Sequence, residues 1–300
     1  MFHALARALL YPFRWNATHL PRGSFLRSAS IPILKYASRR RGLLNSMRVI
    51  RPLDRRDISF VPADSMVMDA TYWFGTQGYE GVLSELWPRL CAKSHCVVEI
   101  GANVGFYTVL GGKAAIGAYT VVEPLPEAAA ILRRNLVLNK LERIEVIEAA
   151  AVPRSMDAPV QLNLPDEGRE AAVGAHLVSE VTLARRSTKR VLDVAGVDIC
   201  RLVKGCDLIK MDAEGAEHAL LTAAMPIIER NAPTIVIEVL PESRLLAALL
   251  AEMAQRIGYT LYVIPSFRTE YPVAVPHASF TSRTPAMFQS KDVILSRDKL

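Results

Sequence analysis

The part of the sequence that most constrains the fold is the stretch of residues 96–123. It contains two apolar runs, Cys96–Ile100 and Ala118–Val122, and a glycine-bounded turn, Gly101–Gly105, follows the first of them. Apolar runs of this length between turn residues are typical of buried strands, and the residues from Phe106 onward suit a helix. We therefore expect a strand, helix and strand unit, with the turn at the edge where parallel sheets bind their ligands.

The residues of this turn suit the binding of a small ligand. Gly101 and Gly105 permit positive φ and let a ligand approach the backbone, and Asn103 tolerates the left-handed conformation. The next backbone N–H groups begin a helix, a position that favours a carboxylate or a phosphate. Glu123 follows the second strand about twenty residues later, where a carboxylate usually accepts hydrogen bonds from the hydroxyls of a ribose. These features predict a ligand that contains a ribose.

The spacing of the glycines narrows the choice of ligand. A dinucleotide fingerprint needs a third glycine, but Asn103 occupies the middle position of the run Gly101–Gly105. Glu99, just before the turn, would repel phosphates but could bind an ammonium group. S-adenosyl-L-methionine combines an ammonium, a carboxylate and a ribose, and it is the cofactor that we expect. The alternative is that Glu99 and the glycines only shape a tight turn.

Two longer motifs resemble known families. VVEIGANVGFYTVL, followed by VVEPLPEAAAILRRNLVLN, resembles the first half of the class I S-adenosylmethionine-dependent methyltransferases, and DLIKMDAEGAEHALL with TIVIEV resembles the FkbM family. The resemblance implies a Rossmann-like α/β fold, with a seven-stranded, mostly parallel sheet, one antiparallel edge strand and helices on both faces. The residues that we expect to bind the cofactor are Glu99, Gly101, Ala102, Asn103, Gly105, Phe106, Glu123, Pro124, Ala150 and Asp212.

The second motif places acidic residues at the same edge of the sheet. Leu208–Met211 is predicted as a strand, so Asp212 and Glu214 would lie at its carboxyl end, and Glu238 would end the next strand. Our hypothesis is that Asp212 is the base or orienter of an acceptor hydroxyl, and that Glu214 holds the acceptor or the cofactor's ammonium. A divalent ion bound by Asp212, Glu214 and Glu238 is a rival, but no His or Asn of clear spacing supports it and we assign no metal.

Three segments are expected along the chain. Residues 1–55 form a basic N-terminal arm, residues 56–95 a helical entrance or lid segment, and residues 96–300 the Rossmann-like cofactor-binding domain. An amphipathic pattern in the entrance segment would place a helix over the mouth of the site, although its aromatic residues could equally be core residues. The candidates for the lid are Tyr72, Trp73, Tyr79 and Glu80.

The net charge of +6 is concentrated in the arm, because residues 1–53 contain ten Lys or Arg and no Asp or Glu. Such a segment with aromatic residues could contact an anionic membrane surface or bind a polyanion. It could also be an extension folded onto the body, or a transit leader. Arg7 argues against a secretory signal, and no apolar run approaches the roughly 18 residues needed to span a bilayer. We expect a cytoplasmic protein that could associate with a membrane at its surface.

The remaining elements are less strongly specified. A helix over residues 126–139 should precede a strand at 144–147 and a loop of small residues at 149–151, where an adenine ring could lie. Exposed strands at 160–164 and 181–186 could form an insertion that selects the acceptor. Near the end, a helix over 242–257 should precede two strands, 259–264 and 291–295, which a plain loop joins.

These features favour an enzyme over a binding protein. The expected function is S-adenosylmethionine-dependent O-methylation of a hydroxyl on a small-molecule, sugar or lipid-linked glycan acceptor. The alternative is a non-catalytic protein that binds S-adenosylmethionine or S-adenosylhomocysteine and carries a membrane-surface arm. A nucleic-acid acceptor is disfavoured, because no Asn-Pro-Pro-Tyr-like motif follows the fourth predicted strand.

Overall fold

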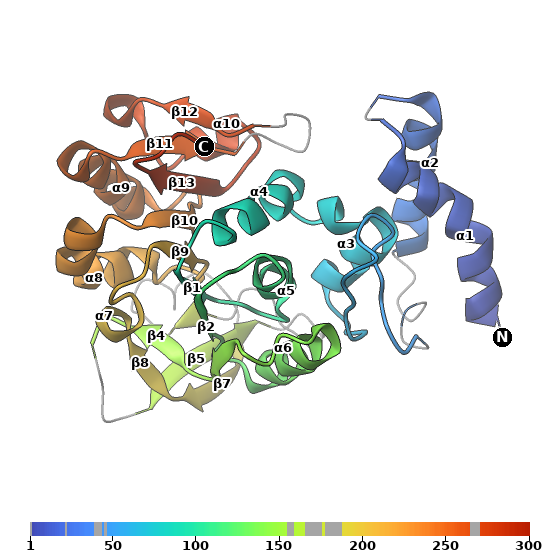
Figure 1. Ribbon diagram of the computed structural model, residues 1–300, viewed down its shortest axis with the longest axis horizontal. Helices are drawn as coiled ribbons and strands as arrows, with labels where there is room; N and C mark the ends of the chain where they lie inside the picture. Colours follow the sequence, from blue (N-terminus) through green and yellow to red (C-terminus); the bar gives the residue numbers. More distant parts are fainter. Residues whose placement is uncertain are drawn as a thin grey trace.

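A large sheet forms the centre of the computed structural model, which describes residues 2–21, 23–38, 44, 47–154, 159–165, 176–177, 188–264 and 271–300 (Figure 1). The sheet has eight strands in the order β12-β11-β13-β10-β9-β1-β2-β3. Its strands are β1 (Cys96–Ile100), β2 (Ala118–Val122), β3 (Glu145–Ile147), β9 (Leu208–Met211), β10 (Thr234–Glu238), β11 (Thr260–Val263), β12 (Val273–Val275) and β13 (Asp292–Ser296).

The pairing of the strands confirms the expected Rossmann-like fold, but the sheet has eight strands and not the predicted seven. Neighbours from β10 to β3 pair in parallel, whereas β13 pairs antiparallel with both β10 and β11. The antiparallel β13 therefore lies inside the sheet, and the additional strand β12 forms the edge beyond β11. The plain loop predicted before β13 is wrong in its described part, which contains β12, a short 3₁₀ helix (His277–Ser279) and α10 (Thr284–Met287).

Helices cover both faces of the sheet, as a parallel sheet requires. Alternate residues of one strand enter different cores: Val97 packs with α4 (Gly81–Cys91), α5 (Phe106–Gly112) and α6 (Pro126–Asn139), and Val98 packs with helices of the other face. The helices of that other face are α7 (Ile199–Leu202), α8 (Glu217–Asn231) and α9 (Arg244–Ile257). The carboxyl ends of β1, β2 and β9 are consequently held between two packed layers.

A smaller group of strands lies beside α6. β4 (Ala150–Val152) pairs with β8 (Gly196–Asp198), and β5 (Val160–Pro165) pairs with β6 (His176–Leu177) and β7 (Thr188–Val194). The loop predicted at residues 149–151 is therefore wrong, because a backbone pairing with β8 makes most of it a strand. The strand predicted at 160–164 is confirmed, and the one predicted at 181–186 lies outside the described residues.

The N-terminal segment forms a helical hairpin that packs on the body. Its helices are α1 (Phe2–His19) and α2 (Phe25–Ser38), and both contact α3 (Met66–Phe74). Leu34 of α2 is fully buried in the same core cluster as Val67 of α3. Arg14 is buried as well; its Nε donates a hydrogen bond of 2.8 Å to the Tyr72 carbonyl, and its guanidinium carbon lies 3.5 Å from the centre of the Tyr72 ring. Of the alternatives for this segment, the structure supports an extension folded onto the body.

None of the helices in the described part of the chain has both the length and the apolar character that crossing a bilayer requires.

The packing of the hairpin predicts that its core residues stabilise the whole domain. Leu34→Ala should lower the free energy of unfolding by about 2–5 kcal/mol, because it removes a buried side chain and leaves a cavity. Ile33→Ala is the matched control: Ile33 is 39% exposed, and its change should be within about 1 kcal/mol of zero. Urea unfolding measures both. A detached hairpin would instead give two variants with the stability of the wild type.

Candidate functional site

The predicted site residues gather around one pocket at the carboxyl ends of β1, β2 and β9. Every residue predicted to bind the cofactor lines this pocket except Gly105, and Glu214 lines it too. Gly105 has a positive φ of 83° and packs against Leu132 of α6. It therefore contributes to the shape of the turn without lining the pocket. The pocket also has an apolar wall, made by Val67, Phe106, Ala150, Ala151 and Leu162.

Gly101 allows the two halves of the site to meet. Its φ is 80°, and a Cβ atom built on it would lie 1.8 Å from the carbonyl oxygen of Asp212. The Asp212 amide in turn donates a 3.0 Å hydrogen bond to the carbonyl of Ile100, the last residue of β1. No side chain larger than a hydrogen atom fits at position 101, so glycine is what lets the turn and the acidic motif share one pocket.

Glu123 joins the turn to the segment that follows β2. One carboxylate oxygen accepts a 2.6 Å hydrogen bond from the Asn103 amide, and the other accepts a 2.9 Å bond from the Leu125 amide. Asn103 has a φ of 51°, the left-handed conformation expected for it. Burial raises the pKa of Glu123 to about 7, although the two amides act in the opposite direction. Each oxygen of an ionised carboxylate can accept a second bond, so Glu123 keeps two acceptor positions.

Glu99 is held deep in the pocket wall. It is buried, and one of its oxygens accepts hydrogen bonds from the hydroxyls of Thr108 (2.9 Å) and Tyr119 (2.7 Å). Burial raises the pKa of this carboxyl. The two hydrogen bonds fix the orientation of the Glu99 carboxyl group. Glu99 therefore has a structural role in addition to any contact with a ligand.

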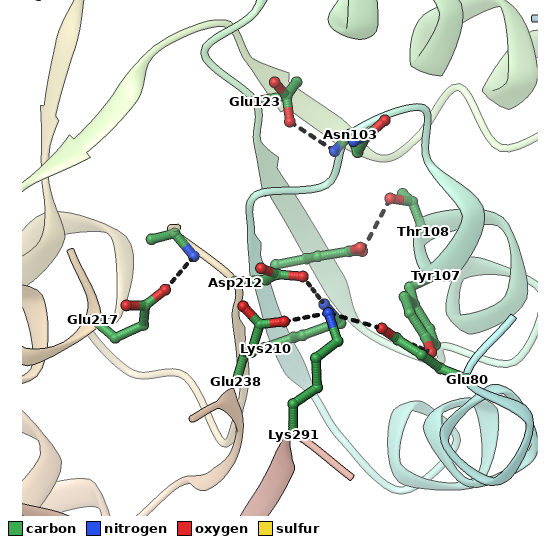
Figure 2. A network of polar contacts seen from close by, with 12 residues as sticks. Glu80, Asn103, Tyr107, Thr108, Glu123, Lys210, Asp212, Glu217, Glu238 and Lys291 are labelled. Carbon is green, nitrogen blue, oxygen red and sulfur yellow. Dashed lines mark hydrogen bonds and ion pairs between the residues drawn. The ribbon is translucent and has the colours of Figure 1, made fainter. Parts of the chain in front are cut away.

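Two lysines lie among the acidic residues of the site, and Figure 2 shows how closely these groups converge. The Lys210 Nζ lies 3.6 Å from an oxygen of Asp212 and 4.8 Å from the centre of the Tyr107 ring. The Lys291 Nζ contacts Glu238 and lies 3.4 Å from Glu80. Burial would lower the pKa of Lys210, but the carboxylates around it, Asp212 first, raise it overall. Glu80 and Glu238 likewise raise the pKa of Lys291 overall, against the effect of burial. Both lysines are therefore cationic, and both line the pocket.

Glu80 connects the entrance segment to this cluster. The hydroxyl of Tyr107 donates a 2.7 Å hydrogen bond to Glu80, whose other oxygen faces Lys291. Asp292 is also buried here, and burial raises the pKa of its carboxyl. The residues of the cluster thus come from the start of α4, from α5, and from the ends of β9, β10 and β13 that face the pocket.

The turn after β9 is organised by an acid other than the predicted ones. One oxygen of Glu217 accepts a 2.8 Å bond from the Ala213 amide, and the other accepts a 2.9 Å bond from the Gly215 amide. Between them Glu214 lines the pocket with a φ of 50°. Burial raises the pKa of Glu217 to about 7.

The comparison with protein families decides the identity of this arrangement. Residues 99–261, more than half of the chain, match the model of the Methyltransferase FkbM domain. The chain belongs to the FkbM methyltransferase family. It is therefore a methyltransferase, and its cofactor is S-adenosyl-L-methionine. No curated protein matches the chain.

Solved structures similar to this FkbM methyltransferase are distant in sequence. Methyltransferase FkbM from Methylobacillus flagellatus KT is 16% identical, with a TM-score of 0.41 over 98% of this chain and 60% of that one. The tRNA (uracil-54, C5)-methyltransferase of Pyrococcus abyssi, in complex with S-adenosyl-L-homocysteine, is 14% identical, with a TM-score of 0.42 over 83% and 44%. An O-methyltransferase from Bacillus cereus is 11% identical, with a TM-score of 0.34 over 72% and 79%. The family assignment is made from the sequence match alone.

The structure separates the candidates for the lid of this FkbM methyltransferase. Tyr79 lines the pocket and Glu80 enters the charged cluster, as the entrance hypothesis requires. Tyr72 and Trp73 are buried in the core beneath the N-terminal hairpin and do not line the pocket. Their selection as lid residues is wrong, and for Trp73 the alternative of a core residue is confirmed. Their position on the inner side of α3 follows the ordinary preference of large aromatic residues for the core.

Sequence reasoning missed the cationic part of the site. Lys210 lies in the middle of a predicted buried strand, where a lysine needs anionic partners to remain charged. That signal was available, since the sequence places Asp212 two residues later. Lys291 carried no such signal, because its partners Glu80 and Glu238 are distant along the chain.

The rival metal site gains no support from the described geometry. Among the described residues, no group of three or more His, Cys, Asp or Glu side chains is placed to hold a metal ion. Glu238, proposed as the third ligand beside Asp212 and Glu214, instead contacts the ammonium group of Lys291.

The steric role of Gly101 can be tested against a glycine with a similar positive φ. Gly101→Ala should cost about 3 kcal/mol or more of folding free energy, because the new Cβ meets the Asp212 carbonyl. Gly205 has a φ of 77° with nothing within 4 Å of an added Cβ, so Gly205→Ala should cost only about 1–2 kcal/mol of backbone strain. Chemical denaturation measures both. Equal losses would show that backbone conformation alone requires Gly101.

Proposed function

We propose that this FkbM methyltransferase binds S-adenosylmethionine along the turn from Gly101 to Asn103, with its ribose at Glu123. The observation that supports this proposal is the environment of Glu123. Its buried carboxylate is fixed by two backbone amides, yet it lines the pocket and keeps acceptor positions for hydroxyl groups. The apolar wall beside it suits an adenine ring, and the acidic residues at the far side suit the ammonium group. The residues present thus fit the cofactor.

We propose further that the methylated atom is the oxygen of an acceptor hydroxyl. The bound cofactor supplies a methyl group activated by a positively charged sulfur. Asp212 would accept a hydrogen bond from the hydroxyl, orient it, and take up its proton. The Lys210 Nζ, 3.6 Å from an Asp212 carboxylate oxygen, holds that carboxylate in place. Lys210 is itself restrained, because its Nζ lies over the ring of Tyr107.

The acceptor's path is proposed to run past Lys291. The residues that line a second hollow include the apolar Val82, Leu83 and Ile264 and the acidic Glu80 and Asp292. Lys291 lines both this hollow and the cofactor pocket. A molecule with a hydroxylated part and an apolar part, such as a small polyol derivative or a lipid-linked sugar, matches this lining.

The first test concerns cofactor binding and its dependence on pH. Since burial raises the pKa of Glu123 to about 7, its carboxyl is largely protonated near pH 6 and ionised near pH 8. The ribose donates hydrogen bonds to the ionised form, so the Glu123 carboxyl must lose its proton when the ligand binds. The affinity for S-adenosylhomocysteine should therefore rise from pH 6 to pH 8. Glu123→Gln should weaken binding by roughly tenfold and flatten the profile, because one charge-assisted bond is worth about that factor.

Calorimetry at several pH values measures these affinities, with Glu142→Gln, a change of an exposed acid, as the matched control. Glu217, whose pKa is also raised to about 7, stays intact in both variants and therefore cannot cause a difference between them. Unchanged affinity in folded Glu123→Gln would exclude the ribose contact.

The second test separates catalysis from binding. Asp212→Asn should lower methyl transfer by roughly 10²- to 10⁴-fold, because the amide cannot take up a proton. Binding of S-adenosylhomocysteine should change far less, since the amide keeps the size of the side chain. Transfer of a labelled methyl group to a panel of hydroxylated and lipid-linked acceptors is the measurement. Full turnover by Asp212→Asn would reject the role of Asp212 as base. If the wild-type protein bound the cofactor tightly but transferred a methyl group to no acceptor, the result would favour a binding protein.

A further inference from the structure

The outward face of α1 is apolar although it faces solvent. Its large exposed side chains are Leu5, Leu9, Tyr11 and Trp15, and Leu9 is 67% exposed. At 100° per residue these positions fall within one half of the helix, and the described part of that half contains no Lys, Arg, Asp or Glu. The opposite half contacts the body through Arg14 and Ala17. Ala6, Leu10 and Phe13 lie on that opposite half too and pack against the core. The helix therefore carries apolar residues on both faces, and those of the outward face are exposed to solvent.

The outward face of α2 has the same character. Phe25, Leu26, Ile33 and Tyr36 are exposed, Phe25 to 82%, while Leu34 and Ala37 are buried on the inner side. Figure 1 shows the hairpin projecting from the domain, with α3 between it and the rest of the chain. Two adjoining helices that both expose aromatic and aliphatic residues form a surface of the kind that binds a partner.

Charge identifies the partner. The first 53 residues contain ten Lys or Arg and no acidic residue, whereas the rest of the chain carries more acidic than basic residues. A second copy of the chain that met this surface through its own hairpin would bring the same positive charge to the contact and would be repelled. A basic segment that exposes apolar and aromatic side chains matches a bilayer that contains anionic lipids, where rings enter the interface and cations meet the headgroups.

We propose that the α1–α2 hairpin docks this protein on anionic lipid bilayers, with the exposed residues of both helices entering the interface. The same hairpin packs on α3, whose Val67 lines the cofactor pocket. Docking would therefore fix the position of the pocket relative to the bilayer. If the proposed function holds, this placement suits an acceptor attached to a lipid, but docking itself does not depend on that function.

The position of Trp15 gives a direct test. Trp73 and Trp87 are buried, and Trp15, 41% exposed, is the remaining tryptophan of the chain. Vesicles of phosphatidylcholine with phosphatidylglycerol should shift the fluorescence of the full chain to the blue, and brominated lipids should quench it. Trp15→Phe should abolish both signals while the protein still floats with the vesicles. Vesicles of phosphatidylcholine alone should give neither signal.

Surface variants separate this docking from general adhesion. Phe25→Ser and Leu9→Ser should each weaken vesicle partitioning by about tenfold, because each removes one large apolar side chain from the interface. Tyr271→Ser is the matched control, since Tyr271 is 70% exposed on the methyltransferase domain, and it should partition like the wild type. Lys35→Glu should weaken binding, and Lys299→Glu, at an exposed position near the C-terminus, should have a smaller effect.

Several outcomes would overturn the proposal: folded protein that does not float with anionic vesicles, equal loss of binding in Tyr271→Ser and Phe25→Ser, or a dimer in solution that Phe25→Ser dissolves. Calorimetric binding of S-adenosylhomocysteine, measured on the same variants, should stay unchanged. That readout distinguishes a failure of docking from a failure of the proposed function.

Discussion

The site depends on the close approach of two strand ends, β1 and β9. Gly101 has no side chain, and the Asp212 carbonyl occupies the space that a Cβ atom would fill. The same approach lets the Asp212 amide bond to the carbonyl of Ile100. Because of this contact, the turn that suits a ribose cofactor and the acidic motif that suits an acceptor line one pocket. Parallel strands bring their carboxyl ends to one edge of the sheet, and glycine brings these two within contact distance.

Electrostatic balance is the second constraint on the site. Buried acids such as Glu238 and Asp292 would be costly without cations, and two lysines supply these charges. Lys210 lies in β9, and Lys291 immediately precedes β13. Separating such a pair would leave an uncompensated buried charge, which is costly. These contacts therefore also hold the start of α4 close to the strand ends. Glu80 extends this balance to α4. The charged cluster therefore links the cofactor pocket to the proposed path of the acceptor.

Much of the fold could be predicted because the decisive signals are local. The turn of Gly101–Gly105 and the helix that begins at Pro126 follow from residue types within a few positions, and both are confirmed. The strand at Ala150–Val152 was missed because its pairing partner Gly196–Asp198 lies far along the chain. Lys291 was missed for the same reason, since it meets Glu80 and Glu238 only after the chain has folded. Long-range pairings of this kind leave no periodic pattern in the sequence.

The arrangement of the cofactor is the central claim, and a crystal structure of the protein with S-adenosylhomocysteine tests it most directly. The account predicts that the ligand lies along Gly101–Asn103, that its ribose hydroxyls contact the carboxylate of Glu123, and that its sulfur faces Asp212. A ligand bound with its ribose away from Glu123, or with its sulfur turned from Asp212, would contradict the assignment of these residues.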